Sequence, residues 1–403
     1  NMYFKRHITD TLKKMLVQFK VVLLTGPRQV GKSTLLKNEL KNYEYVTLDD
    51  MQELELARTD PALFFKNHKL PLIIDEVQYA PELFKYIKFL LDKDESKGQI
   101  CLTGSQTYSL MQNVSESLAG RIGILELQGF SVREKMQNDF LDYFIPNAEY
   151  IQSRSENKNQ IDDIWEYIFR GSMPELSDLS LNWDFFYRSY VKSYIERDVR
   201  NLMNIKDESL FYKFMVALAS RTGCLFNAAD IANTIGVSLK TIQSWISVLE
   251  ASGIIFFLRP YENNLLKRVV KTPKIYFNDT GLVCYLVGWD NKKVAQNGAM
   301  AGELFETFIV SEIVKSWINQ GKDLRNLFFY RDGNQKEIDL LIKKNDDLYP
   351  VEIKMTGSPS ISMAKHFPVL KEIKQIQNGT ILCQCEKHLF LSDSIQILPV
   401  DFI

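Results

Sequence analysis

The first third of the chain alternates short apolar runs with helical patterns. The four apolar runs lie at residues 21–25, 45–48, 72–76 and 99–103. The run at residues 21–25 is too continuous for a strand with one exposed face, and we expect a second buried strand at residues 72–76. A helical pattern at residues 60–68 separates two of them. This alternation is typical of a doubly wound parallel sheet, and we predict such an α/β domain over residues 2–150.

The next part of the chain has a helical pattern. Aromatic and aliphatic side chains recur at helical spacing between residues 184 and 221, which is typical of helices with one buried face. We predict a helical lid over residues 151–222.

A pair of shorter helices is predicted after the lid. Asn227 and Ser238 are natural N-cap residues, Gly236 suits the turn between the helices, and an apolar run follows at residues 253–258. This outline predicts a winged helix-turn-helix over residues 223–262. The exposed face of its second helix carries a thin set of DNA-contacting candidates, namely Lys240, Thr241, Gln243 and Ser244. DNA binding and an interaction or lid role both remain open for this unit.

The last third of the chain begins with a helical pattern at residues 301–317. Strand-like runs follow at residues 327–330, 337–342 and 349–355. A second helix is expected at residues 360–374, and two more strands complete the chain. We therefore predict an α/β domain of order αβββαββ over residues 263–403.

Composition and charge narrow the range of functions. The chain of 403 residues is 45% hydrophobic and 25% charged, as in ordinary globular proteins. Its formal net charge of -1 excludes a global positive field that would attract nucleic acid, so any DNA contact must be local. No apolar stretch approaches the roughly 18 residues of a membrane span. We expect a cytoplasmic protein without a membrane partner.

A complete GxxxxGK[ST] motif follows the first apolar run. Its glycines allow successive backbone N–H groups to face a phosphate chain, and the helix that starts here directs its positive end to the same point. The phosphate-binding residues are Gly26, Pro27, Arg28, Gln29, Val30, Gly31, Lys32, Ser33 and Thr34. We expect Lys32 to reach the β- and γ-phosphates and Ser33 to ligate Mg²⁺. The motif makes the first domain a P-loop NTPase sheet.

Polar residues at the ends of two later strands suit the same site. Asp75 is placed to hold Mg²⁺ through water, and Glu76 to polarise the water that attacks the γ-phosphate. The strand at residues 99–103 leads to Ser105, which we expect to act as a γ-phosphate sensor. Because no NKxD guanine-reading motif is present, we expect ATP rather than GTP.

These residues together resemble a known family. The segments GPRQVGKST, LIIDEVQ, LTGSQ and SLAGR look like those of bacterial and archaeal AAA+-type ATPases of the AAA_14 group. The resemblance implies that Arg121 contacts a γ-phosphate, either of its own chain or of a neighbouring subunit in a homo-oligomer. A surface salt bridge is the alternative for Arg121. The family likeness also suggests that the turn at residues 170–174 lies near adenine, with a plain turn as the alternative. It suggests that Arg197 approaches the nucleotide, although a solvated helical face is the interpretation we favour for it. We interpret Asp279, another family feature, as a helix cap, with a functional role as the alternative.

The strands of the last third carry a second group of charged residues. Asp339 interrupts an apolar strand, while Glu352 and Lys354 leave the same face of the next strand. Two carboxylates and a lysine in this order can hold a divalent metal against a phosphate and position a water. The pattern resembles the PD-(D/E)xK nuclease superfamily, and the domain looks like the DUF4143 domain that accompanies AAA_14 ATPases. The resemblance implies that Glu306, Asp339 and Glu352 are metal ligands and that Lys354 is catalytic.

Three functions remain open after these steps. We favour an ATP-hydrolysing, Mg²⁺-dependent protein whose nucleotide state controls a restriction-endonuclease-like domain acting on or binding DNA. The alternative is an ATP-dependent regulatory protein with an inactive nuclease-like domain that grips DNA or a protein partner. A ring-forming motor is the third. Residues 260–403 carry 18 basic and 17 acidic residues, which gives little support for tight duplex binding.

Overall fold

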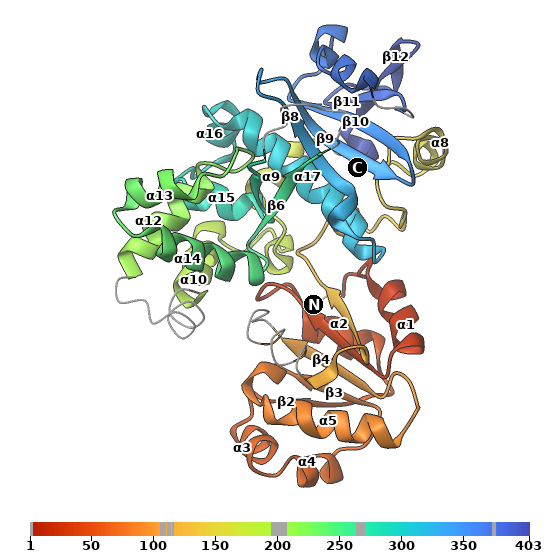
Figure 1. Ribbon diagram of the computed structural model, residues 1–403, viewed down its shortest axis with the longest axis vertical. Coiled ribbons are helices and arrows are strands. Elements are labelled where there is room, and N and C mark those ends of the chain that lie inside the picture. The colour runs from red at the N-terminus through yellow and green to blue at the C-terminus, as the bar shows by residue number, and fades with distance from the viewer. Residues whose placement is uncertain are drawn as a thin grey trace.

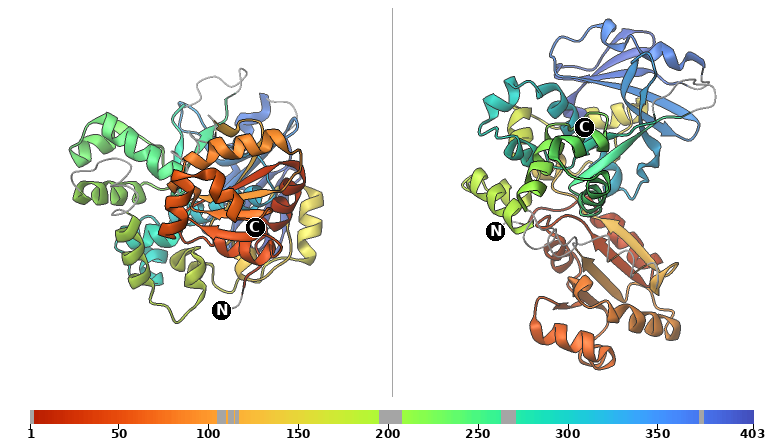
Figure 2. Two further views of the ribbon diagram at one scale, coloured as in Figure 1. Left: turned by 90° about the horizontal axis from the view of Figure 1, so that it is seen from below. Right: turned by 60° about the vertical axis from the view of Figure 1, so that its left-hand side comes forward.

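The computed structural model contains an N-terminal sheet, a group of helices at its side and a C-terminal sheet. It describes residues 3–104, 110, 114, 117–194, 208–262, 271–372 and 376–403. The two sheets lie at opposite ends of the molecule, and helices α10, α12, α13 and α14 lie to one side of them (Figure 1). Figure 2 shows the same separation from two further directions.

The N-terminal sheet is parallel, with the strand order β2-β3-β4-β1-β5. Its strands are β1 (Val21–Thr25), β2 (Glu44–Thr47), β3 (Leu72–Asp75), β4 (Ile100–Gly104) and β5 (Ile122–Glu126). Every residue of β1, β3 and β4 is buried, which explains why the sequence shows them as continuous apolar runs. The predicted α/β fold is confirmed. β5 was not predicted, because its alternating burial makes it look like an ordinary surface segment.

Helices cover this sheet on both faces. They are α1 (Thr9–Gln18), α2 (Lys32–Glu39), α3 (Met51–Thr59), α4 (Pro61–Asn67) and α5 (Glu82–Lys93), with the short 3₁₀ helix η1 (Val77–Tyr79) after β3. Asp50 and Asp60 cap α3 and α4 by accepting hydrogen bonds from backbone N–H groups of the first turn. The phosphate loop lies at the carboxyl end of β1, where it leads into α2.

The middle of the chain is helical. Its elements are α7 (Val132–Lys135), α8 (Ala148–Glu156), α9 (Ile164–Arg170), η2 (Pro174–Ser177), α10 (Trp183–Tyr194), α12 (Glu208–Ala219), α13 (Ala228–Ile235), α14 (Leu239–Ala251), α15 (Thr280–Leu286) and α16 (Lys292–Asn297). The side chains of Asn227 and Ser238 accept hydrogen bonds at the starts of α13 and α14, as expected. Gly236 ends α13 in the left-handed conformation that a β-carbon disfavours.

The C-terminal sheet has eight strands in the order β12-β13-β11-β10-β9-β8-β6-β7. They are β6 (Ile255–Pro260), β7 (Lys274–Phe277), β8 (Leu327–Arg331), β9 (Glu337–Lys344), β10 (Asp347–Lys354), β11 (Gly379–Cys383), β12 (Leu389–Ser392) and β13 (Ile395–Pro399). The long helix α17 (Ala301–Asn319) packs against β7 and β10. β6 and β7 precede α17 in the chain, so the middle segment supplies two strands to this sheet.

One predicted element of this domain is wrong. The helix expected at residues 360–374 is replaced by two short 3₁₀ helices, η5 (Ile361–Ala364) and η6 (Phe367–Glu372). Pro368 explains the difference, because it has no N–H to donate and its ring clashes with the carbonyl of Ala364 in a continuous α-helix. The remaining 3₁₀ helices are η4 (Leu324–Asn326) and η7 (Val400–Phe402).

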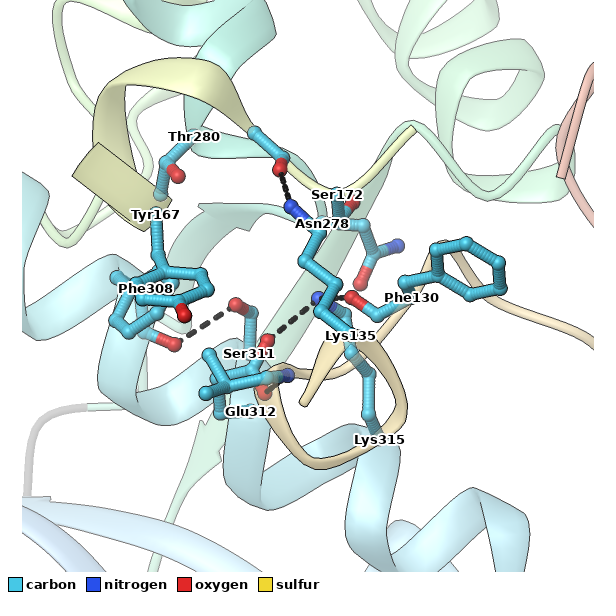
Figure 3. A pocket seen from close by; sticks show the side chains of 12 residues that line it. Phe130, Lys135, Tyr167, Ser172, Asn278, Thr280, Phe308, Ser311, Glu312 and Lys315 are labelled. Atoms are coloured by element: carbon cyan, nitrogen blue, oxygen red, sulfur yellow. Dashed lines mark hydrogen bonds and ion pairs between the residues drawn. The ribbon is translucent and has the colours of Figure 1, made fainter. Parts of the chain in front are cut away.

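Hydrogen bonds and ion pairs of buried side chains connect α17 to the segment that follows β5 (Figure 3). The Lys315 ammonium lies 2.7 Å from Glu312 Oε1 and donates to the Phe130 carbonyl, while Glu312 Oε2 accepts from Val132 N at 2.8 Å. Lys135 donates to the carbonyl of Gly171 nearby. Burial, together with Lys315, lowers the pKa of Lys135 to about 8. Helix α17 is thus fixed to the segment that follows β5 through buried charges.

Among the described residues, no helix combines the length and the apolar character that crossing a membrane requires.

Candidate functional site

The phosphate loop connects β1 to α2. Its first glycine, Gly26, has φ = +142°, and a β-carbon there would lie 2.0 Å from the Leu127 carbonyl oxygen. Gly31, at φ = +90°, precedes the first turn of α2. Neither position accepts another residue without strain. The loop backbone therefore approaches the segment after β5 closely, and the N-terminus of α2 faces the space that phosphates occupy in such loops.

Lys32 lies inside the curve of this loop. Its buried ammonium donates to the carbonyl oxygens of Gly26 at 3.0 Å and Pro27 at 2.8 Å. A phosphate chain that enters the loop offers this ammonium a charged acceptor, which binds more strongly than a neutral carbonyl. The position of Lys32 thus suits the role predicted for it.

Ser33 and Asp75 meet at the carboxyl end of the sheet. Ser33 Oγ lies 2.9 and 2.8 Å from the two carboxylate oxygens of Asp75, which is buried at 5% exposure. Thr103 and Tyr45 also donate to this carboxylate, Tyr45 at 2.6 Å. Burial and the adjacent Asp75 raise the pKa of Tyr45, so its hydroxyl remains a donor. A hydroxyl beside a carboxylate is a donor set that fits Mg²⁺.

Glu76 is held by an unusual backbone conformation. Its φ of +58° is in the left-handed region, which is strained for a residue other than glycine. The Glu76 N–H donates to Thr103 Oγ1 at 3.1 Å, and Gln78 donates to the Glu76 carboxylate. The side chain lines the same cavity as Lys32 and Ser33. The Glu76 carboxylate is thus available in the cavity that Lys32 and Ser33 line.

Two adjoining cavities form one elongated site. The first, of about 510 Å³, is lined by Lys32, Ser33 and Glu76, and the second, of about 550 Å³, by aromatic residues such as Tyr3, Phe4 and Phe130. They share a set of lining residues, namely Gly31, Thr34, Pro174 and Glu175. A charged part next to an aromatic part matches the phosphates and the base of a nucleotide. Pro174 lies in the turn that the family resemblance placed near adenine.

Arg121 is not brought together with these residues. It precedes β5, whose first residue pairs with Val21 at the start of β1, whereas the phosphate loop follows the end of β1. The length of a five-residue strand, about 16 Å, separates the two. Arg121 instead forms a partly exposed ion pair of 2.9 Å with Asp92. Contact with the nucleotide of its own chain is therefore not met in this structure, and contact with a neighbouring subunit stays a prediction.

Two other expected contributors, Ser105 and Arg197, lie outside the described residues. Their roles stay predictions.

Arg6 is a residue of this region that the sequence did not indicate. Its guanidinium donates to the carbonyls of Val30 at 2.8 Å and Gln128 at 2.7 Å, and its Nε lies 3.1 Å from Glu134 Oε1. It also lines the cavity beside Phe130. Since its partners lie 24 to 128 residues away in sequence, no local motif indicates it.

The turn that follows helix α14 approaches the phosphate loop closely. Gly253, after α14, has φ = +70°, and a β-carbon on it would lie 2.9 Å from Pro27 Cγ. Asn278 Nδ2 donates to the Gly253 carbonyl at 2.8 Å, and the Asn278 backbone N–H donates to Ile254. The end of α14 is therefore fixed between the phosphate loop and the strand β7.

Asp279 caps α15, as expected, and also accepts hydrogen bonds from two other segments. Its Oδ1 accepts from Gly281 N at 2.9 Å and from Ser172 N at 3.2 Å, and its Oδ2 accepts from the Tyr187 hydroxyl at 2.9 Å. Ser172 lies in the turn that leads to Pro174. One buried carboxylate thus connects the turn that leads to Pro174, helix α10 and the end of β7.

Asp339, Glu352 and Lys354 come together on β9 and β10. The Lys354 ammonium lies 3.0 Å from Asp339 Oδ2 and 2.6 Å from Glu352 Oε2, and Ile353 N donates to Asp339 at 2.8 Å. Burial and the neighbouring Asp339 raise the pKa of Glu352 to about 9. Although burial opposes it, the charges of Lys354 and Lys274 lower the pKa of Asp339. Asp339 is thus the ionised member of this pair of carboxyl groups.

Glu306 has different partners. Its Oε1 accepts from the Lys274 ammonium at 3.0 Å and from the Tyr276 hydroxyl at 2.6 Å. Burial raises the pKa of Glu306 to about 7. Within the part of the chain that the structure describes, no three His, Cys, Asp or Glu side chains are grouped so that they could hold a metal ion. The residues predicted to hold a metal in this domain are instead paired with Lys274 and Lys354 in this arrangement.

Family models match three parts of the chain. Residues 18–136 match the AAA_14 model, an AAA domain, and residues 301–403 match a domain of unknown function, DUF4143. Residues 161–293 match another domain of unknown function, DUF8612. These matches support the architecture of an AAA-type ATPase domain followed by a C-terminal DUF4143 domain.

Several relatives align with this chain over most of its length. The chain is 28% identical over 402 residues to the uncharacterized proteins Rv2008c of Mycobacterium tuberculosis and Mb2031c of Mycobacterium bovis, covering 99% of this chain and 84% of each relative. It is 24% identical over 343 residues to the uncharacterized protein MJ1637 of Methanocaldococcus jannaschii, covering 76% of this chain and 71% of that protein.

Among solved structures, the chain is similar to the Walker-type ATPase PABY2304 of Pyrococcus abyssi. The TM-score is 0.43 at 15% identity, over 70% of this chain and 96% of that one. For Thermotoga maritima RuvB the TM-score is 0.31 at 17% identity, over 62% of this chain and 88% of RuvB.

Proposed function

We propose that this AAA-type ATPase is a Mg²⁺-dependent switch that binds and hydrolyses ATP and transmits its nucleotide state to the C-terminal domain. The observation that carries the proposal is the contact of Pro27, in the phosphate loop, with Gly253, at the end of the helix pair. A movement of the phosphate loop on nucleotide binding would therefore displace Gly253 and the end of α14. β6, which begins two residues after Gly253, pairs with β8 of the C-terminal sheet.

Each residue of the site would have a separate role in ATP hydrolysis. Ser33 and Asp75 are placed to hold Mg²⁺, which when bound would neutralise charge on the β- and γ-phosphates. Lys32 would turn from the loop carbonyls to the phosphates. Glu76 would orient the attacking water and accept its proton. Pro174 and the aromatic cavity would hold the base.

Coupling predicts a nucleotide-dependent change at residues 252–258 and 274–278. We expect a nonhydrolysable ATP analogue with Mg²⁺ to change hydrogen exchange in both segments of the wild type. The change should be absent in Lys32→Ala, which loses phosphate binding, and present in Lys41→Ala, whose exposed side chain lies beyond α2. ATP hydrolysis without any change in exchange at these segments would contradict the coupling while leaving the ATPase intact.

We further propose that the output is binding of DNA or of a protein partner rather than cleavage. The support is that Lys354 and Lys274 already neutralise the carboxylates expected to hold a catalytic metal. The α13–α14 pair, which we interpret as a winged helix, adds an exposed Lys240 for phosphate contact. A role for this pair in DNA binding is part of the proposal.

Cleavage assays separate the two outputs. We expect plasmid and single-stranded DNA to stay intact with Mg²⁺ or Mn²⁺, with and without ATP, for wild type and Lys354→Ala alike. Metal-dependent cleavage that requires Lys354 would instead establish a PD-(D/E)xK nuclease and exclude a purely binding role.

A further inference from the structure

The carboxyl groups on α17 and β9 have a partner from outside the segment matched by the DUF4143 model. Lys274 is the first residue of β7, within the segment matched by the DUF8612 model. Its ammonium lies 3.0 Å from Glu306 Oε1 on α17 and 2.5 Å from Glu337 Oε1 on β9. The Lys274 side chain is only 3% exposed. Burial of a lysine ammonium costs free energy unless opposite charges compensate it, and Glu306 and Glu337 provide these charges here.

The other groups around this lysine complete the compensation. Tyr276, two residues along β7, donates to the same oxygen of Glu306 at 2.6 Å. Arg331 binds the second oxygen of Glu337 at 2.6 Å. Lys354 forms ion pairs with the two other carboxyl groups of the cluster, Asp339 and Glu352. Three cationic side chains are thus distributed among four carboxyl groups, and each carboxyl group already has a cationic partner.

We propose that the Lys274 ammonium is the resident cation of this carboxylate cluster and takes the place that a divalent metal would need. This inference rests on the binding role proposed above for the C-terminal domain, and it is independent of ATP hydrolysis. An ammonium bound to Glu306 and Glu337 opposes the binding of a divalent ion there, because two positive charges at contact distance repel each other in a buried site. The middle segment, through β7, therefore keeps the C-terminal cluster free of metal.

The proposal predicts that removing one side chain creates a metal site. Mn²⁺ would be titrated into the full-length, nucleotide-free protein at pH 8, with free Mn²⁺ measured by electron paramagnetic resonance. We expect the wild-type isotherm to be unchanged by Asp339→Asn. Lys274→Met should gain one Mn²⁺ per chain, and the double variant with Asp339→Asn should lose it again. Lys271→Met, an exposed lysine three residues earlier, is the matched control and should gain none.

Each other result counts against the proposal. A Mn²⁺ site in the wild type that disappears in Asp339→Asn would show that the cluster binds metal despite Lys274. A folded Lys274→Met variant that gains no site would show that Lys274 is not what excludes the metal. If Lys274→Met does not fold, as judged by circular dichroism, the comparison of wild type with Asp339→Asn still decides. A failed ATPase or exchange experiment would leave these results unaffected.

Discussion

Replacing Glu76 by Gln should reduce ATP hydrolysis by about 100- to 10,000-fold, the usual contribution of a positioned general base, while ATP binding persists. The amide keeps the shape of the side chain and its place in the cavity but cannot accept a proton from water. Phosphate release measures turnover, and a fluorescent ATP analogue measures binding.

Glu82→Gln is the control for this variant. Glu82 is exposed in the first turn of α5, so its replacement removes a charge of the same kind outside the cavity, and turnover should stay at the wild-type rate. Wild-type turnover in Glu76→Gln would exclude Glu76 as the base. Loss of ATP binding would assign it a binding role instead.

Replacing Arg6 by Ala should destabilise the N-terminal sheet by about 3–5 kcal/mol, because Glu134 would remain buried without its ionic partner. The carbonyls of Val30 and Gln128 would lose their donor as well. All five tryptophans lie C-terminal to residue 164, so their fluorescence does not report on this sheet. The free energy of opening is better measured by hydrogen exchange of β1 and β5.

The neighbouring lysine offers a matched control. Lys5 pairs with Asp139 on the surface, where both side chains are more than half exposed, and Lys5→Ala should leave the opening free energy almost unchanged. Equal effects of the two substitutions would contradict the importance assigned to the buried pair.

The buried ion pair of Arg6 and Glu134 should make the stability of the fold depend on pH. Burial opposes ionisation of Glu134, but Arg6 and the backbone donors outweigh it and lower the pKa of Glu134. A carboxylate with a lowered folded-state pKa stabilises the fold above its unfolded pKa, and this contribution is lost as the pH falls through the folded value. The difference between wild type and Arg6→Ala should therefore be full at neutral pH and shrink in acid.

Local sequence determined the first domain of this protein to a large extent. The order of buried strands, the phosphate loop and the position of Asp75 and Glu76 depend on contiguous residues, and the parallel sheet has the predicted form. N-caps such as Asn227 and Ser238 were also readable, because a cap acts within one turn of its own helix. The helix predicted at residues 360–374 was wrong because Pro368 interrupts it, which is also a local effect.

Only the tertiary structure decided which charged residues are partners. Arg121 follows a family motif but lies at the opposite end of β5 from the phosphates, since the direction of a strand is set by the sheet. Pro27 and Gly253 are 226 residues apart and meet only because the chain returns to the phosphate loop. Glu306, Asp339, Glu352 and Lys354 were recognisable as a set, yet Lys274 was not, because nothing in its own segment indicates the carboxylates that surround it. Burial and distance determine the ionic partner of a charge, and both depend on the packing of segments that are remote in the sequence.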